Sequence, residues 1–195
     1  YALVEDCSVH HSGGWGFSVR GTLTDLNILD SDFEYNGTLN TDEGIGFDID
    51  DPTTVTSVTV TGGSFSHNTA KGINLVATNN ATFTEITASN NGGDPAGGFG
   101  VSLWEWKSSS SNITFESCTF ANNSTDGILV GTQDTYTITG ITVNGCLLTG
   151  NGRSGILFYH DFGGSASNIA INGCYLDGNG PSGGIARSAL SSPID

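Results

Sequence analysis

Two aspartates, Asp48 and Asp50, stand two residues apart in the segment Gly46-Phe-Asp-Ile-Asp50. In an extended strand both side chains point to the same face, with Cα atoms about 6.6 Å apart. Carboxylates at such a separation can act as acid and base around a glycosidic bond, because inverting glycoside hydrolases leave room for a water between the two groups. Asp51 follows directly and is a third candidate catalytic carboxylate.

The same cluster has two other interpretations. Asp42 and Glu43 precede Asp48 and Asp50, and these four side chains offer the hard oxygen ligands that Ca²⁺ prefers. Calcium is therefore the one cofactor that the sequence suggests. The other interpretation is a solvated acidic surface, since the chain carries 20 Asp and Glu against 5 Lys and Arg and has a formal net charge of -15.

Aromatic residues form a second candidate site. Trp104 and Trp106 end one segment of alternating apolar residues, and Tyr159 ends the equivalent segment two repeats later. Exposed aromatic rings on a flat surface suit stacking against sugar rings, because an apolar face with a polar handle matches an amphipathic pyranose. The alternative is a packing edge against a neighbouring domain.

Among the histidines, His160 is the one that we expect to act as an acid or base, because Tyr159 and Asp161 flank it. The other three, His10, His11 and His67, fall in turns or at strand ends and are expected at the surface.

A repeat of about 28 residues must position these side chains. Each unit has an Asn, or Ser12 in the first unit, followed by a Gly and a large apolar residue, and the Gly positions are spaced by 30, 26, 28, 27, 28 and 29 residues. A period of this size indicates stacked supersecondary units. The seven markers are Gly16-Phe17, Gly46-Phe47, Gly72-Ile73, Gly100-Val101, Gly127-Ile128, Gly155-Ile156 and Gly184-Ile185.

Apolar residues alternate with polar ones inside each unit, as in Ile141, Val143 and then Cys146, Leu148. Alternation indicates strands, and Gly, Asn and Ser separate the strands as turns. The sequence therefore predicts an all-β fold, a right-handed parallel β-helix of about seven coils without obvious terminal caps. A left-handed β-helix would keep a strict hexapeptide rhythm, which these variable units lack. We expect a single domain over residues 1–195.

Stacked coils bring the residues after successive markers side by side. Alternate residues of these strands point outward, and the candidate substrate-binding residues on this strip are Arg20, Asn74, Trp104, Trp106 and Tyr159. The links from Asn36 to Gly46 and from Asn91 to Gly100 are longer than the others. They predict two walls beside the strip, although neutral surface loops are the alternative.

Three of the four cysteines, Cys118, Cys146 and Cys174, hold the same place in consecutive units. Cys7 lies four coils from Cys118, roughly 19 Å at one strand spacing per coil, which is beyond bridging distance. At most one disulfide between stacked neighbours is compatible with this arrangement. We expect a ladder of buried free thiols.

Composition restricts the partners and the location. A strongly acidic chain repels nucleic acid and anionic lipid, and no apolar run approaches the roughly 20 residues of a membrane helix. We therefore expect neither nucleic acid nor a membrane as a partner. The richness in Ser, Thr, Asn and Gly favours an extracellular or cell-surface protein. Because Tyr1 already lies in a strand pattern, we expect a processed chain or a piece of a larger one.

The repeat as a whole resembles the pectin-lyase-like superfamily, right-handed β-helices that include polysaccharide lyases, hydrolases and uronate epimerases. Asn40-Thr-Asp42 followed by Asp50-Asp51 is similar to the Asn-Thr-Asp and Asp-Asp motifs of polygalacturonase-type hydrolases, which implies catalytic roles for Asp42, Asp50 and Asp51. Their Gly-His-Gly and Arg-x-Lys motifs are absent here. The segment Ser12-Gly-Gly-Trp-Gly-Phe17 is similar to the strand entry of mannuronan epimerases, but Ser18-Val-Arg20 stands where those enzymes have Asp-Pro-His.

Two function classes follow from the sequence. The first is a secreted protein that engages polysaccharide along the outward strip, with hydrolase, lyase or epimerase-like chemistry. The small number of cations favours a neutral glycan, or an acidic one bridged by Ca²⁺. The second is a non-catalytic module that stacks end to end, or on neighbouring domains of a larger chain, as a fibre, adhesin or carbohydrate-binding domain.

Overall fold

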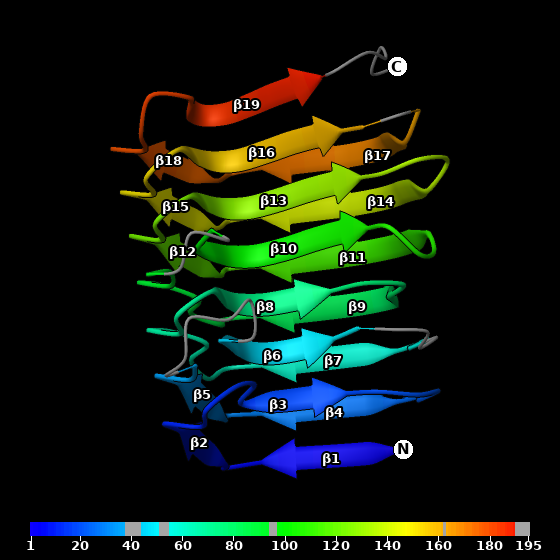
Figure 1. Cartoon of the computed structure of the whole chain (residues 1–195), viewed down its shortest axis with the longest axis vertical. Coiled ribbons are helices and arrows are strands. Elements are labelled where there is room, and N and C mark those ends of the chain that lie inside the picture. The colour runs from blue at the N-terminus through cyan, green and yellow to red at the C-terminus, as the bar shows by residue number, and fades with distance from the viewer. Residues whose placement is uncertain (38–43, 51–54, 94–96, 162, 190–195) are drawn as a thin grey trace.

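The computed structural model describes residues 1–37, 44–50, 55–93, 97–161 and 163–189. Its strands lie one above another in a tall stack, and each turn of the chain adds one layer (Figure 1). All the strand pairs that it describes are parallel. The predicted parallel β-helix is confirmed, and the sheets of seven strands agree with the predicted number of coils.

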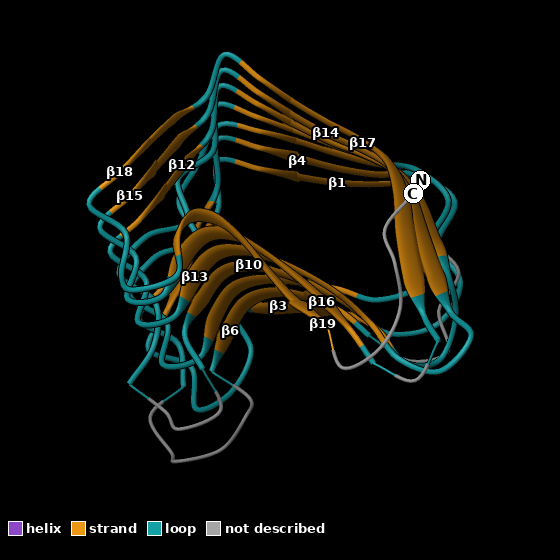
Figure 2. Cartoon of the chain, turned by 90° about the horizontal axis from the view of Figure 1, so that it is seen from above, coloured by secondary structure: helices purple, strands orange, loops and turns teal. Residues whose placement is uncertain are grey.

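Three faces enclose the core, as the view along the stack shows (Figure 2). The first face, the β1 sheet, contains seven strands in the order β1-β4-β7-β9-β11-β14-β17. These strands are β1 (Ala2–Glu5), β4 (Leu26–Leu29), β7 (Val58–Thr61), β9 (Asn79–Thr84), β11 (Ser110–Glu116), β14 (Thr137–Asn144) and β17 (Ser165–Asn172).

The second face, the β3 sheet, also contains seven strands and runs from β3 to β19. It consists of β3 (Phe17–Val19), β6 (Ile45–Ile49), β8 (Lys71–Leu75), β10 (Phe99–Glu105), β13 (Asp126–Thr132), β16 (Ser154–His160) and β19 (Gly183–Ala189). Each of these strands begins within one residue of a Gly marker.

Short strands make the third face. One pair is β2 (Ser8–His10) with β5 (Asp32–Glu34), and one group of three is β12 (Thr119–Ala121), β15 (Leu147–Thr149) and β18 (Tyr175–Asp177). Isolated bridges from Ser64 to Thr87 and from Thr87 to Thr119 carry the pairing between the two groups. The third face is therefore continuous, although its strands are short.

The core consists of the inward side chains of all three faces. Phenylalanines stack between layers, with ring centroids 5.5 Å apart for Phe33 and Phe65 and 5.2 Å apart for Phe83 and Phe115. These four rings are fully buried. Their burial removes a large apolar area from water, and each Å² of buried apolar surface stabilises the fold by about 25 cal/mol. Burial of these stacked side chains therefore stabilises the fold.

A column of asparagines joins the third face to the β3 sheet. The side-chain amide of Asn91 donates to the Asn123 side-chain oxygen at 3.0 Å and to the Phe65 carbonyl at 3.1 Å. Its own oxygen accepts from the backbone and side chain of Asn68. The neighbouring marker has no room for a side chain, because a Cβ on Gly100 would lie 2.6 Å from the Gly127 carbonyl. The Asn and Gly signature is therefore a packing requirement.

The cysteine column is confirmed. Thr119, Leu147 and Tyr175 are in register, which aligns the preceding Cys118, Cys146 and Cys174. All four cysteines are free thiols; Cys118 and Cys146 are buried, Cys174 is half-buried and Cys7 is exposed. Within the described part of the chain, no helix is both long and apolar enough to cross a membrane.

Candidate functional site

The outward side of the β3 sheet carries the candidate site. Register pairs Ser18 with Asp48, Asp48 with Asn74 and Asn74 with Ser102 on successive coils, and Leu129 and Leu157 continue the same row. The inward neighbours, such as Phe47 and Ile49, are fully buried in the core. The predicted outward strip is therefore confirmed as a physical row of side chains.

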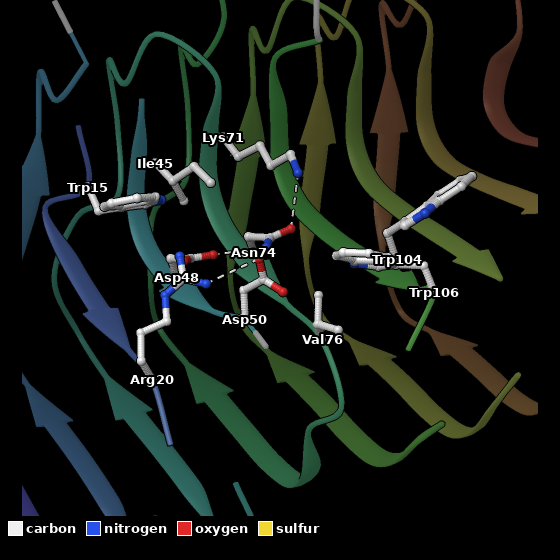
Figure 3. A pocket seen from close by; sticks show the side chains of 10 residues that line it. All are labelled: Trp15, Arg20, Ile45, Asp48, Asp50, Lys71, Asn74, Val76, Trp104 and Trp106. Carbon is white, nitrogen blue, oxygen red and sulfur yellow. Dashed lines mark hydrogen bonds and ion pairs between the residues drawn. The ribbon is translucent and has the colours of Figure 1, made fainter. Parts of the chain in front are cut away.

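A pocket of about 340 Å³ opens on this row. Trp15 lies at one end, Trp104 and Trp106 lie at the other, and Asp48, Asp50 and Asn74 lie between them (Figure 3). The remaining lining residues are Arg20, Ile45, Lys71 and Val76. All three tryptophans of the chain thus line one cavity.

Asp48 forms the floor of the pocket and is only 1% exposed. One carboxylate oxygen accepts a hydrogen bond from the Asn74 amide at 2.9 Å. The other accepts from Arg20 at 2.9 Å and from the Ser18 hydroxyl at 3.2 Å. Burial raises the pKa of Asp48 above its ordinary value, and the neighbouring Asp50 adds to the rise, while Asn74, Arg20 and Ser18 oppose it.

Arg20 bridges the two aspartates. Its Nη2 lies 2.9 Å from the Asp48 carboxylate and its Nη1 lies 3.3 Å from the Asp50 carboxylate. The guanidinium also stands over the Trp15 ring, 5.0 Å from the centroid. One cation therefore separates two like charges and holds an aromatic wall of the pocket in place.

Asn74 and Lys71 extend the hydrogen-bonded network from Asp48. The Lys71 ammonium donates to the Asn74 side-chain oxygen at 3.1 Å, while the Asn74 amide donates to Asp48. These contacts fix the orientation of the Asn74 amide. The described lining residues hold two carboxylates, Asp48 and Asp50, and two cations, Arg20 and Lys71, so their formal charges cancel.

Trp104 lies flat against the next coil. A Cβ built on Gly131 would meet the indole at 2.3 Å, so the ring covers the backbone where other residues would carry a side chain. Beyond Gly131, the Tyr159 ring stacks on Trp104 with centroids 5.4 Å apart. Leu129, Leu157 and Phe99 are buried and form a small apolar cluster that Trp104 and Tyr159 pack against. The two aromatic rings form a platform at the surface of the sheet.

Trp106 is the most exposed tryptophan, at 42%. The Lys107 ammonium lies 3.7 Å from the centroid of its ring. The ammonium covers one face of the Trp106 indole, and the same ring lines the edge of the pocket.

The family model for the right-handed beta helix region matches residues 1–164 of the chain. The chain belongs to this family. The handedness expected from the sequence is thereby confirmed for the parallel β-helix described above. No curated protein and no solved structure matches the chain.

Most of the sequence-predicted site residues meet in this β-helix. Asp48, Asp50, Arg20, Asn74, Trp104 and Trp106 all line the pocket, and Tyr159 joins it through Trp104. Asp42, Glu43 and Asp51 lie outside the described residues, as do residues 38–43 and 94–96 of the two long links. The predictions that concern them are untested by this geometry.

His160 does not join the pocket. It points inward at the end of β16, where it is 5% exposed and its Nδ1 lies 2.8 Å from the Thr132 hydroxyl. Burial lowers the pKa of its imidazole, and the charge of Arg187 adds to this effect. The alternation that turns Tyr159 outward turns His160 inward, so His160 lies on the opposite side of the sheet from the pocket, and its role as an acid or base stays a prediction.

Trp15 and Lys71 were missed by the sequence interpretation. Lys71 directly precedes the marker Gly72, and its register partner on the adjacent coil is Ile45, which also lines the pocket. Strand alternation assigns both residues to the inward side, with Phe47 and Ile73, so alternation alone does not place them in the pocket. Trp15 lies in a turn before Gly16, and its role depends on the Arg20 contact, which no spacing rule reveals.

Calcium binding at the aspartates remains a prediction. The described residues contain no group of three or more His, Cys, Asp or Glu side chains arranged to hold a metal ion. Asp48 and Asp50 both pair with Arg20 instead. As arranged, the two carboxylates fit a guanidinium better than they fit Ca²⁺.

Proposed function

We propose that this β-helix protein binds a polysaccharide along the outward side of its β3 sheet, with the tryptophan pocket as the principal sugar subsite. The observation that carries the proposal is the gathering of all three tryptophans around a hydrogen-bonded polar floor. Aromatic rings provide apolar faces for a pyranose, and carboxylate, amide and ammonium groups match its hydroxyls. The acidic, Ser- and Thr-rich composition supports a place of action outside the cell.

The geometry favours binding over hydrolysis. An acid catalyst must reach the glycosidic oxygen, but Asp48 is buried and both of its oxygens accept hydrogen bonds from protein groups. An inverting pair also needs a water between its carboxylates, and here the Arg20 guanidinium bridges them. Asp48 is accordingly a positioning residue that orders Asn74 and Arg20. Asp50, with a side chain that is 25% exposed and paired with Arg20, is the more accessible of the two carboxylates.

A neutral glycan is the preferred ligand. The two carboxylates and two cations of the described pocket balance, so a uronate would find no net positive field there. The formal charge of the whole chain is -15, which repels a polyanion at long range. A polymer of neutral sugars pays neither cost.

Affinity electrophoresis in gels that contain single polysaccharides, neutral and acidic, tests the proposal. We expect retention by a neutral polymer, and we expect Trp104→Ala and Trp15→Ala each to weaken it by about tenfold, the effect of losing one aromatic contact. Tyr175→Ala is the matched control, because Tyr175 is 60% exposed on β18 of the third face. Equal retention of all variants, or loss in the control alone, would contradict the proposal.

Three additional assays separate the alternatives. Reducing-end release over long incubation tests hydrolysis, and we expect none; turnover that disappears in Asp50→Asn would show a catalytic carboxylate instead. Retention with and without a chelator tests the calcium bridge, and we expect no difference for a neutral polymer. Sedimentation of the sugar-free protein tests end-to-end stacking, since concentration-dependent growth into long assemblies would favour a fibre.

A further inference from the structure

A second cluster of functional groups lies on the third face. His10 ends β2, His11 follows in the turn, and their Nδ1 atoms are 3.0 Å apart. Consecutive residues of a strand point to opposite sides, so neighbouring side chains do not normally converge. Here the left-handed backbone of His11, with φ of 59°, turns its ring back toward His10. The two rings meet edge to face at 84°.

Stacking fixes the orientation of the His11 ring. It lies parallel to Tyr35, within 5° and with centroids 5.6 Å apart, and Tyr35 lies parallel to His67 at 4.6 Å. The three rings come from the same corner of successive coils. Tyr35 is stacked between His11 and His67, and its ring limits the rotation of the His11 imidazole.

This corner stores backbone strain. Tyr35 and His67 have φ of 54° and 58°, and bulky residues rarely adopt the left-handed region. The same corner on later coils holds residues that adopt it easily, namely Asn90, Asn122, Gly150 and Gly178. The left-handed backbone at this corner is thus a feature of the repeat, and the first three coils differ from the later ones in placing a ring there.

The separation of the two nitrogens suits one metal ion. Ligand nitrogens at 2.0 to 2.1 Å from an ion lie about 2.9 Å apart at a right angle and about 3.3 Å apart at the tetrahedral angle. The hydrogen bond between the two Nδ1 atoms shows that these ring nitrogens face each other. An ion would displace the shared proton and lie to one side of the line between the nitrogens, and the ring that held this proton would carry it on Nε2 instead.

The surrounding charge favours a cation. His10 is in register with Glu34 on the next coil. The preceding residues, Val9 and Phe33, pack in the core, so alternation turns His10 and Glu34 outward. Imidazole nitrogen suits Cu²⁺, Zn²⁺ and Ni²⁺, with Cu²⁺ bound most tightly, whereas Ca²⁺ and Mg²⁺ require oxygen ligands.

We propose that His10 and His11 form a two-nitrogen site for a divalent transition-metal ion, with Cu²⁺ as the ion that it binds best. The described residues contain no group of three or more protein ligands, so water completes the coordination and the site stays open and exchangeable. The Tyr35 and His67 rings are positioning groups for His11. The site lies on a different face from the tryptophan pocket and does not depend on the proposed glycan binding.

Titration of the chelator-treated full chain with Cu²⁺ tests this site, followed by calorimetry and by electron paramagnetic resonance. We expect one strong site per chain and splitting from two nitrogen ligands. His10→Gln and His11→Asn should each weaken binding by at least about tenfold and remove one nitrogen from the spectrum. Asn is chosen at position 11 because it tolerates the left-handed backbone that Asn90 and Asn122 adopt at the same corner.

His67→Asn is the matched control, since it removes an imidazole from the same ring stack but not from the pair. It should keep two-nitrogen coordination and most of the affinity. Thermal midpoints in the presence of chelator show whether each variant is folded. Equal loss in His67→Asn, or parental affinity in both His10→Gln and His11→Asn, would overturn the proposal, and competition by excess Ca²⁺ would also contradict it.

Discussion

At the scale of single residues, the pocket depends on a glycine that never touches a ligand. Gly131 leaves the space that the Trp104 indole occupies, since a Cβ would come within 2.3 Å of the ring. Gly131→Ala should displace Trp104 and weaken glycan retention by about tenfold, close to the effect of removing the ring. Gly93→Ala is the control, because a Cβ there meets no atom within 4 Å. Retention by Gly131→Ala equal to that of the parent would show that the flat position of Trp104 is unimportant.

A buried carboxyl next to Trp104 makes the stability depend on pH. Glu105 is fully buried and accepts hydrogen bonds from the Ala77 amide at 2.9 Å and from the Ser110 hydroxyl. Burial raises its pKa from 4.5 to about 7, with the two hydrogen bonds opposing the rise. Between these values the folded state binds more protons than the unfolded state. The free energy of unfolding therefore falls as pH rises through this window, by about 3 kcal/mol at most from this group.

Glu105→Gln removes this titration while keeping the shape of the side chain. We expect the difference in unfolding free energy between the variant and the parent to shift in favour of the variant between pH 4.5 and pH 8. Urea unfolding at several pH values measures it. Taking the difference cancels the other titrating groups, including His160, whose lowered pKa acts in the opposite direction. A difference in unfolding free energy that does not change with pH would refute the raised pKa of the buried Glu105 carboxyl.

At the scale of elements, the asparagine column connects the coils. Asn91→Ala removes two donated and two accepted hydrogen bonds from a buried position. The Asn68 backbone N–H then loses its Asn91 acceptor, while the Asn68 side-chain amide keeps the Phe33 carbonyl. We expect a loss of about 3 kcal/mol or more in the free energy of unfolding. Asn172→Ala, at an exposed position that ends β17, should change it by less than about 0.5 kcal/mol. Similar losses in the two variants would mean that the column is not a structural element.

Strand register was predictable from the sequence because a repeat constrains it. Once the markers align, Phe17, Phe47 and Ile73 must stack, and the outward neighbours Ser18 and Asp48 must follow. The same periodicity predicts the cysteine and asparagine columns. Alternation alone also places His160 inward, so the sequence contained the information needed to exclude it from the pocket.

The remaining features depend on the paths of long side chains. The Arg20 guanidinium contacts Asp48 and Asp50 on the next coil and the Trp15 ring on its own coil. The Trp104 ring lies flat on the sheet, over Gly131, and does not project into solvent. Neither path follows from a 28-residue period, because the period fixes Cα positions and not rotamers. Asp48 and Asp50 both pair with Arg20 in this arrangement, and their role as an acid and base pair stays a prediction.

At the scale of the whole molecule, the β-helix holds a flat face on a rigid stack of coils, and binding should change the protein little. Because Trp15, Trp104 and Trp106 are the only tryptophans and all line the pocket, tryptophan fluorescence reports the occupancy of this one site. The most direct measurement is a titration with the retained neutral polysaccharide. We expect a saturable change in emission and reduced quenching by acrylamide, both lost in Trp104→Ala. Binding of the polysaccharide with unchanged tryptophan emission and quenching would contradict it.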